Sequence, residues 1–307
     1  MGTIDNSTEF DFNVDENQTS NAQNSEHHNV APNPSPVSSV AQPQIPGDSA
    51  PYVVLCGPPS SGKSMVLKSL ANYLYQAGLG YSIAANTTLL NSAAYQADCN
   101  NFNRCISNPN TRFENTTNYL LADIFDDRGN VVAHFLEAPG EHYFDLNNIE
   151  SEPNIPFQGY LTKIAQVTIN KPRKVIYIIL LDLDSTNSFR NNEGLRKTYE
   201  QKMLKLYNSF VLNHPSRVVL LYNKADVPMQ GLWANTGGVL NVEAIRKDAL
   251  LNYPMLFNQF KRPFLFWKLD NYSFLPYCTG SYPADGSYTA SGPAYPAELW
   301  KEITKLW

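Results

Sequence analysis

The chain has 307 residues, of which 43% are hydrophobic and 17% charged, and its formal net charge is −5. These values are typical of a globular protein in solution. No apolar run approaches the roughly 20 residues that a membrane-spanning helix needs, and the polar N-terminus does not resemble a secretory signal. We therefore expect a cytoplasmic protein with no membrane span.

Residues 1–50 differ in composition from the rest of the chain. They are rich in Asn, Ser, Pro and Gln, and they hold seven acidic residues but no Lys or Arg. Such a segment has too few large apolar side chains to offset the entropy of ordering, so we predict a disordered acidic tail. Residues 51–307 are nearly neutral without a clustered basic face, which gives no reason to expect a nucleic-acid partner.

The four cysteines, Cys56, Cys99, Cys105 and Cys278, contain no C-x-x-C pair. This spacing favours a reducing compartment over a disulfide framework or a zinc site.

A complete phosphate-binding pattern follows the tail. The pattern G-x-x-x-x-G-K-S is formed by Gly57, Pro58, Pro59, Ser60, Ser61, Gly62, Lys63 and Ser64. A short apolar run, 51–56, precedes it and predicts a buried strand, and helical spacing continues after it as far as Ala77. This arrangement of strand, glycine loop and helix is the one that a phosphate site requires.

The chemistry of this loop follows from its residue types. Glycines allow consecutive backbone N–H groups to point at phosphate oxygens, and the helix N-terminus adds the positive end of its dipole. Lys63 is expected to reach the β- and γ-phosphates, and the Ser64 hydroxyl to ligate Mg²⁺. The sequence therefore predicts a nucleoside-phosphate site.

From Pro51 onward, apolar strands alternate with amphipathic helices. After the first strand and helix, we predict strands near Tyr119–Phe125, Val131–Glu137, Val175–Leu183, Val218–Tyr222 and Phe264–Leu269. We predict helices near Phe157–Thr168, Gly194–Leu212, Val242–Phe257 and Ala297–Leu306. The pattern indicates an α/β fold in which helices cover both faces of a mostly parallel sheet.

Three segments between these elements are also informative. The turn cluster 126–130 predicts an antiparallel hairpin between two strands. Residues 79–117 form a long polar insertion, with a helix possible around Ala93–Phe102, and residues 270–295 have the composition of a loop.

A second motif, Asn223-Lys224-Ala225-Asp226, follows the apolar run that ends at Tyr222. A carboxylate at the carboxyl end of a strand can accept two hydrogen bonds from guanine N1–H and N2–H₂. Adenine lacks this donor pair, so it would leave a buried Asp226 unpaired. Lys224 is expected to pack along the base, and Asn223 to connect this loop with the P-loop.

Together with the P-loop, this motif resembles the N-K-x-D sequence of Ras-like small GTPases. The resemblance covers most of residues 51–307. It implies a three-layer α/β/α P-loop fold with a six-stranded, mostly parallel sheet and one antiparallel edge strand. It also implies Mg²⁺-dependent binding of GTP and GDP, and two switch segments that respond to the γ-phosphate. The insertion 79–117 would then extend the first switch, and a protein partner would read the switch segments.

The third motif, Glu137-Ala138-Pro139-Gly140-Glu141-His142, stands where the family carries D-x-x-G. Gly140 matches and would contact the γ-phosphate. Glu137 replaces the family's Asp near Mg²⁺, and its additional methylene changes its reach. Glu141 and His142 stand where the family positions the attacking water, and a carboxylate there repels the γ-phosphate. Nucleotide binding thus follows from the motifs more directly than turnover does.

Two further positions come from the family's order of motifs alone. The Mg²⁺-ligating threonine of the first switch corresponds best to Thr117, with Thr116 and Thr111 as alternatives. The segment that backs the base corresponds to residues 276–281, where we select Thr279.

The sequence thus predicts a GTP/GDP switch whose hydrolysis is slow or stimulated by a partner. Two alternatives stay open. One is a P-loop ATPase or small-molecule kinase, in which Asn223–Asp226 is structural. The other is a scaffold that binds GTP without hydrolysing it. Separately, Asp182 or Asp184 at the end of the central strand could act as the Mg²⁺ carboxylate if Glu137 does not, or could cap the next loop.

Overall fold

A seven-stranded sheet forms the centre of the computed structural model. The structure describes residues 43–108, 111, 119–138, 162–164, 175–182, 192–210, 216–224, 241–264, 267–270, 272–281 and 289–305. The strand order in the sheet is β2 (Ser82–Ala85), β3 (Leu120–Phe125), β4 (Val131–Glu137), β1 (Tyr52–Cys56), β5 (Val175–Asp182), β6 (Ser216–Asn223) and β9 (Tyr272–Pro276). All neighbours pair in parallel except at β3, which runs antiparallel to both β2 and β4.

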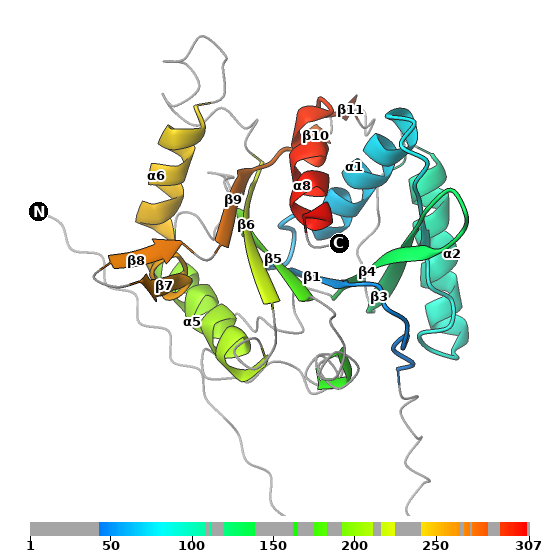
Figure 1. Cartoon of the computed structure of the whole chain (residues 1–307), viewed down its shortest axis with the longest axis horizontal. Helices are drawn as coiled ribbons and strands as arrows, with labels where there is room; N and C mark the ends of the chain where they lie inside the picture. The colour runs from blue at the N-terminus through cyan, green and yellow to red at the C-terminus, as the bar shows by residue number, and fades with distance from the viewer. Residues whose placement is uncertain are drawn as a thin grey trace, which may run out of the picture. The chain divides into compact units, whose positions relative to one another are not determined.

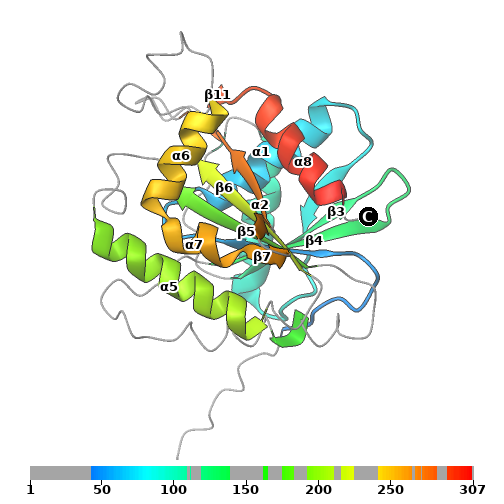
Figure 2. The same ribbon diagram turned by 60° about the vertical axis from the view of Figure 1, so that its left-hand side comes forward.

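Helices cover both faces of this sheet (Figures 1 and 2). They are α1 (Lys63–Gln76), α2 (Ala93–Ser107), α5 (Glu193–Phe210), α6 (Val242–Asn252), α7 (Pro254–Gln259) and α8 (Ala294–Thr304). Helix α1 packs against α2 and α8, and α7 packs against α5 and α6 on the other side of the sheet. The predicted three-layer α/β/α class is confirmed, and the sheet has one strand more than the six expected.

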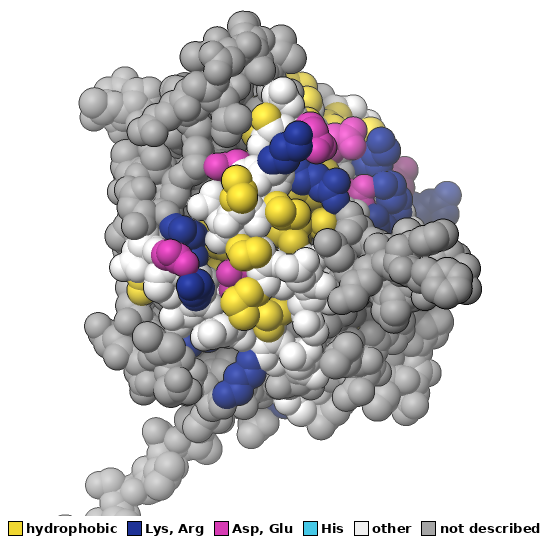
Figure 3. Space-filling view, turned by 90° about the vertical axis from the view of Figure 1, so that its left-hand side faces the viewer, with side chains coloured by type: hydrophobic (Ala, Val, Ile, Leu, Met, Phe, Trp, Pro, Cys, Tyr) yellow, Lys and Arg dark blue, Asp and Glu magenta, His cyan; other side chains and the backbone are white. Residues whose placement is uncertain are grey.

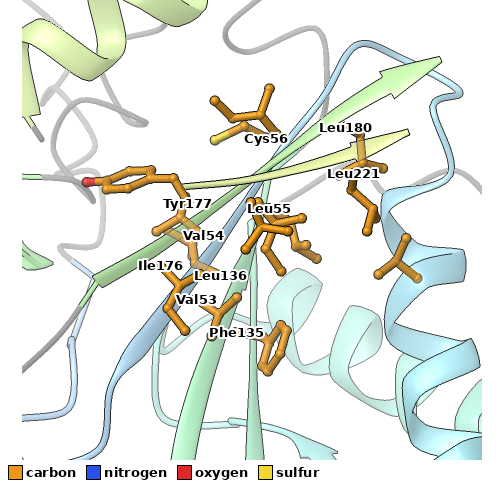
Figure 4. Close-up of a cluster of buried hydrophobic side chains, with 14 of the residues drawn as sticks. Val53, Val54, Leu55, Cys56, Phe135, Leu136, Ile176, Tyr177, Leu180 and Leu221 are labelled. Carbon is orange, nitrogen blue, oxygen red and sulfur yellow. The ribbon is translucent and has the colours of Figure 1, made fainter. Parts of the chain in front are cut away.

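The core lies along the central strands β1, β4, β5 and β6. Every residue of β1 is buried, as is the apolar run of β5 from Val175 to Leu181. Figure 4 shows apolar side chains from all four strands gathered in one cluster. Parallel strands buried on both faces need such continuous apolar runs, which is why the sequence pattern located them. The four cysteines are buried as well, and none of them forms a disulfide.

The predicted hairpin is confirmed between β3 and β4. Asp126 Oδ1 accepts hydrogen bonds from the backbone N–H groups of Arg128 (3.0 Å) and Asn130 (2.7 Å). Gly129 has a φ of 80°, a left-handed conformation that glycine adopts without steric cost. The hydrogen bonds from Asn130 and Arg128 hold the pKa of the Asp126 carboxyl below its usual range.

The insertion 79–117 contributes the additional strand. Strand β2 pairs antiparallel with β3 from Ser82 to Ala85 and so lies outside the antiparallel strand. Helix α2 then starts at a Ser92 N-cap, whose hydroxyl accepts a hydrogen bond from the Tyr95 N–H. The possible helix around Ala93–Phe102 is present and continues to Ser107.

The predicted strand Phe264–Leu269 is wrong. Its residues contribute to a separate antiparallel hairpin of β7 (Lys261–Phe264) and β8 (Trp267–Asp270). The last strand of the main sheet is β9, within the segment expected to be a loop. An edge strand needs no continuous apolar run, and Tyr272–Pro276 is only half-buried. For this reason the apolar pattern of the sequence did not indicate a strand there. Two very short strands, β10 (Gly280–Ser281) and β11 (Thr289–Ala290), follow it.

The helix expected at Val242–Phe257 is divided by Pro254. Helix α6 ends at Asn252 and α7 begins at Pro254, with Tyr253 between them at φ −132° and ψ 52°. Proline disfavours a helical conformation of the residue before it but suits the first turn of a new helix. Of the helix predicted at Phe157–Thr168, the structure describes only 162–164, which are helical.

The surface that carries α5 and α6 is chemically mixed. Helix α6 exposes Val242, Leu250 and Leu251, and Figure 3 shows apolar groups on this side between basic and acidic ones. Within the described residues, no helix has the length and hydropathy needed to cross a membrane.

Helix α8 is attached to the sheet by a polar network at Glu302. Its Oε2 accepts hydrogen bonds from Ser273 Oγ on β9 (2.6 Å) and from Arg217 on β6. Burial alone would raise the pKa of Glu302, but hydrogen bonds from Lys305 and Ser273 and the charges of Arg217 and Lys305 outweigh it and lower this pKa. The network therefore stabilises the fold at neutral pH and loses this contribution as pH falls through the lowered pKa of Glu302.

We predict that Glu302→Ala lowers the free energy of unfolding by roughly 2–3 kcal/mol, because it leaves a partly buried guanidinium without its carboxylate. Urea denaturation at neutral pH measures this change. The matched control is Glu298→Ala on the same helix, whose ion pair with Lys301 is exposed, and we expect a loss below about 1 kcal/mol there. Equal losses in the two variants would contradict the assigned role of Glu302.

Candidate functional site

The P-loop connects β1 to α1 through a tight turn. Ser60 and Gly62 adopt positive φ values of 59° and 89°, and the Ser61 N–H donates to the Pro58 carbonyl at 3.3 Å. The first hydrogen bond of the helix then forms from the Val66 N–H to the Gly62 carbonyl at 2.9 Å. The loop thus closes immediately before the N-terminus of α1, where the free N–H groups of a helix favour an anion.

Close packing explains both glycines of the motif. A Cβ at Gly57 would lie 2.5 Å from Ser61 Oγ and 3.0 Å from Leu180 Cβ. A Cβ at Gly62 would lie 2.6 Å from Asn223 Nδ2, in addition to the strain of its positive φ. Only glycine fits at either position without displacement of these neighbours.

The ammonium group of Lys63 lies against the loop that precedes it. Lys63 is buried, and its Nζ donates to the carbonyls of Gly57 and Pro58, both at 3.0 Å. The charge is thereby held beside the backbone that would surround a phosphate. The neighbouring Cys56 takes no part in this chemistry, because burial raises the pKa of its thiol to about 12 and keeps it protonated.

Ser64 and Glu137 meet across the ends of two parallel strands. The register pairs Leu55 of β1 with Glu137 of β4, so the carboxylate arrives beside the start of α1. The Ser64 hydroxyl donates a hydrogen bond to Glu137 Oε1, and Glu137 is buried. Glutamate at this position therefore reaches the serine of the P-loop despite its additional methylene.

These two oxygen groups suit Mg²⁺, which prefers hard oxygen ligands and retains several waters. No group of three or more His, Cys, Asp or Glu side chains in the described part of the chain is arranged to hold a metal ion. A Mg²⁺ ion held by Ser64 and Glu137 would need further oxygen ligands, which phosphate oxygens and water can supply. The donor set fits the ion on these terms.

The strand that carries the N-K-x-D motif is joined to the P-loop directly. Asn223 is the last residue of β6, and its Nδ2 donates to the Ser61 carbonyl at 2.7 Å in a buried contact. Lys224 follows with a φ of 58°, an uncommon value for a residue with a side chain. In the paired register, Asp182 at the end of β5 lies opposite Asn223.

Thr279 lies just beyond the strand next to β6. The Tyr277 N–H donates to the Tyr222 carbonyl at 2.8 Å, so the pairing of β6 and β9 continues past Pro276. Thr279 is buried two residues later. The structure thus places Thr279 and Asn223 at the carboxyl ends of adjacent parallel strands, on the same edge of the sheet.

Five of the predicted site residues lie outside the described residues: Thr117, Gly140, Glu141, His142 and Asp226. The alternatives Thr116 and Asp184 lie outside them as well. Their assignments stay predictions from the sequence. The residues that the structure brings together are those of the P-loop with Glu137 and Asn223.

One residue near this site was missed in the sequence. Lys68 lies about one turn beyond Ser64 on α1 and is buried. Its Nζ donates to the Asn108 carbonyl at 3.2 Å and to the Thr111 carbonyl, so it connects the P-loop helix to the end of the insertion. Burial lowers the pKa of Lys68. The sequence feature that could have identified Lys68 is its position as a lysine within the apolar face of an amphipathic helix.

No protein-family model and no curated protein matches the chain. Several solved structures are similar to it. One is the signal recognition particle receptor SRb-GTP/SRX complex from Chaetomium thermophilum, with 12% identity, 84% of this chain and 99% of that chain covered, and a TM-score of 0.41.

Two other similar structures are longer chains, of which this chain spans about half. The GTPase-like domain of S. cerevisiae Ski7, bound to GDP and inorganic phosphate, has 15% identity over 83% of this chain and 50% of that chain, with a TM-score of 0.37. Methanosarcina barkeri Roco2, bound to GDP, has 17% identity over 87% of this chain and 53% of that chain, with a TM-score of 0.32. The strand order and the P-loop described above establish the fold independently of these superpositions. The chain has the three-layer α/β fold of P-loop nucleotide-binding proteins.

We predict that Gly62→Ala weakens both the fold and phosphate binding. Its positive φ costs about 1–2 kcal/mol with a side chain present, and displacement of Asn223 adds about 1–3 kcal/mol. Urea denaturation measures the loss of stability, and calorimetric titration with a nucleotide measures the loss of affinity.

Gly78→Ala is the matched control for Gly62→Ala. Gly78 also has a positive φ, 61°, but a Cβ there would meet nothing within 4 Å. Only the backbone cost is expected, with nucleotide affinity unchanged. If both variants lose the same stability and keep the same affinity, the contact between Gly62 and Asn223 has no role in the site.

Proposed function

We propose that this chain is a Mg²⁺-dependent guanine-nucleotide-binding protein that acts as a GTP/GDP regulatory switch. One observation carries the proposal: the hydrogen bond from Asn223 to the Ser61 carbonyl. It joins the strand end that would read the base to the loop that would hold the phosphates. A chance N-K-x-D sequence elsewhere in the fold would have no such contact.

The phosphates would bind at the N-terminus of α1. Backbone N–H groups of the loop would surround them, and Lys63 would exchange its two carbonyl contacts for phosphate oxygens. Ser64 and Glu137 would hold Mg²⁺ together with these oxygens. When bound, the ion neutralises part of the phosphate charge.

Guanine would be selected by Asp226, with Lys224 along the base and Thr279 behind it. Asn223 ends β6 and fixes the start of this loop against the P-loop. Asp226, three residues after Asn223, would then face the same edge of the sheet as the phosphates. Its carboxylate accepts two hydrogen bonds from guanine and is left unpaired by adenine.

The switch function rests on the sequence at Gly140, Glu141 and His142. Gly140 would contact the γ-phosphate and move when it is lost, as in order–disorder switches of nucleotide-binding proteins. The carboxylate of Glu141 would repel the γ-phosphate, so hydrolysis would be slow, would use His142, or would need a group from a protein partner. Thr117 would complete the Mg²⁺ ligands from the first switch.

We predict that Asp226→Ala removes the preference for guanine nucleotides. In the wild type, GTP and GDP should bind with Mg²⁺ at least about 100-fold more tightly than ATP, and the variant should lose about 10- to 100-fold in GTP affinity alone. Calorimetric titration with GTP, GDP and ATP measures these affinities. Asp127→Ala, an exposed residue of the β3–β4 turn, is the control and should behave as the wild type.

ATP affinity equal to that of GTP, unchanged by Asp226→Ala, would reject the assignment of the base site. The ATPase or kinase alternative would then hold, with only the P-loop retained. Tight GTP binding without single-turnover hydrolysis would instead favour the scaffold alternative.

We predict that Glu137→Gln weakens the Mg²⁺ dependence of nucleotide binding. The neutral amide keeps an oxygen near Ser64 but loses the charge that attracts the cation, so the Mg²⁺ concentration for half-maximal GTP binding should rise about tenfold or more. A Mg²⁺ titration at constant GTP measures it. Glu200→Gln is the matched control, because Glu200 is also buried but binds the Met255 and Leu256 N–H groups at the start of α7. An unchanged Mg²⁺ requirement in Glu137→Gln would exclude Glu137 from the metal site.

A further inference from the structure

Residues 43–50, which precede β1, make contacts with the domain, although the sequence predicts that they belong to the disordered tail. The Gln44 N–H donates to the Leu89 carbonyl at 2.7 Å, and Lys163 Nζ donates to the Pro43 carbonyl at 2.9 Å. The Tyr52 hydroxyl donates to the Pro46 carbonyl. We refer to residues 43–50 as the N-terminal segment. Residues 1–42 are covalently joined to the domain through it.

The strongest attachment of this segment is a buried histidine between two carboxylates. His134 on β4 is fully buried, and its Nδ1 lies 2.7 Å from Asp123 Oδ1 on β3. Its Nε2 lies 3.0 Å from both carboxylate oxygens of Asp48, in the N-terminal segment. The histidine thus bridges the sheet and the segment.

The fold positions each partner of His134 independently. Asp123 and His134 are directly opposite each other in the antiparallel pairing of β3 with β4. The second oxygen of Asp123 accepts a hydrogen bond from Asn86 Nδ2 at 2.8 Å, which fixes the orientation of the carboxylate. Asp48 in turn accepts a hydrogen bond from the Ala50 N–H at 2.9 Å.

This geometry requires the charged form of the histidine. A neutral imidazole has one donor and one lone pair, and here the lone pair would face a carboxylate on one side. The imidazolium donates on both sides and forms a charge-assisted hydrogen bond with each carboxylate. The Tyr52 ring is stacked on the imidazole at a centroid distance of 4.8 Å, an arrangement that also favours a cation.

Within the described residues, the titratable and aromatic groups that contact His134 come from three elements: Asp123 from β3, Asp48 from the N-terminal segment and Tyr52 from β1. Burial of the ring opposes its charge. The hydrogen bonds and charges of Asp123 and then Asp48 outweigh this effect, so the pKa of His134 is raised above its ordinary value.

We propose that Asp48, His134 and Asp123 form a pH-sensitive clasp that holds the N-terminal segment on the domain. The clasp is closed when His134 carries a proton and opens when it loses this proton. The clasp does not depend on nucleotide binding, so a failure of the proposed function would leave this proposal unaffected.

The two sides of the clasp differ in strength. The Asp123 side chain is nearly buried and belongs to the sheet, whereas the side chain of Asp48 is 44% exposed. Water therefore screens the outer contact more than the inner one. Deprotonation leaves one donor, which the inner carboxylate of Asp123 retains, and the contact with Asp48 is the one that breaks.

The sign of the pH dependence follows from the raised pKa. The stabilising contribution is complete below the ordinary pKa of histidine, about 6.5, and is lost as pH rises through the higher pKa of the folded protein. The N-terminal segment should accordingly be released from the domain at alkaline pH.

We would test the clasp by hydrogen exchange of the Gln44 and Ala50 amides in the full chain. The measured quantity is the protection factor, which removes the intrinsic effect of pH on exchange. Between about pH 5.5 and about pH 9, we expect protection in the wild type to fall about tenfold or more, the size of effect expected when a charge-assisted hydrogen bond is lost. Asp48→Asn should show low protection at every pH.

Two further measurements make this test specific. Asp127→Asn removes an acidic charge from the exposed β3–β4 turn and should keep the wild-type profile. NMR titration of the His134 ring, assigned by comparison with His134→Gln, should give a pKa above about 6.5 in the wild type and a lower pKa in Asp48→Asn.

Three results would overturn the proposal. They are constant protection across this pH range in the wild type, a wild-type profile in Asp48→Asn, and a His134 pKa below about 6.5. Because Asp48 is partly exposed, its substitution tests the clasp even if His134→Gln does not fold.

Discussion

The site depends on one constraint, the parallel register of the four central strands. Because β4, β1, β5 and β6 run in the same direction, their carboxyl ends meet at one edge of the sheet. The register pairs Leu55 with Glu137 and Asp182 with Asn223, so residues far apart in the sequence arrive beside the start of α1. The contacts that join the P-loop to other strands, from Ser64 to Glu137 and from Asn223 to the Ser61 carbonyl, follow from this alignment.

The contacts in the site also explain which residue types the loop tolerates. Asn223 approaches so closely that Gly62 has no room for a side chain, and Ser61 does the same to Gly57. The glycines therefore serve two needs, backbone conformation and close packing. At Glu137, by contrast, the chain departs from the family pattern, and the longer side chain still reaches Ser64. A longer carboxylate is compatible with this geometry because the end of β4 lies beside that of β1.

The periphery of the sheet is where this chain elaborates the fold. The insertion adds β2 and α2 on one side, and Lys68 attaches its end to the P-loop helix through backbone carbonyls. On the other side, the β7–β8 hairpin precedes β9, and Arg217, Ser273 and Glu302 join β6, β9 and α8. Strands β3 and β4 also receive the N-terminal segment through His134. In each case a charged side chain with defined partners joins a peripheral segment to the rest of the domain.

The sequence by itself determined the P-loop, the central strands, the β3–β4 hairpin and the three-layer class. These features are local patterns: a glycine motif, continuous apolar runs and a turn cluster each act within about ten residues. Only the tertiary structure decided that β9 completes the sheet, that Asn223 binds the P-loop, and that His134 lies between two carboxylates. Asp48 and His134 are 86 positions apart and Ser61 and Asn223 are 162 apart, while the pairing of Asp123 with His134 and the place of β9 depend on how the strands align. No local pattern encodes such pairings, because they arise from how the sheet aligns its strands and what packs against them.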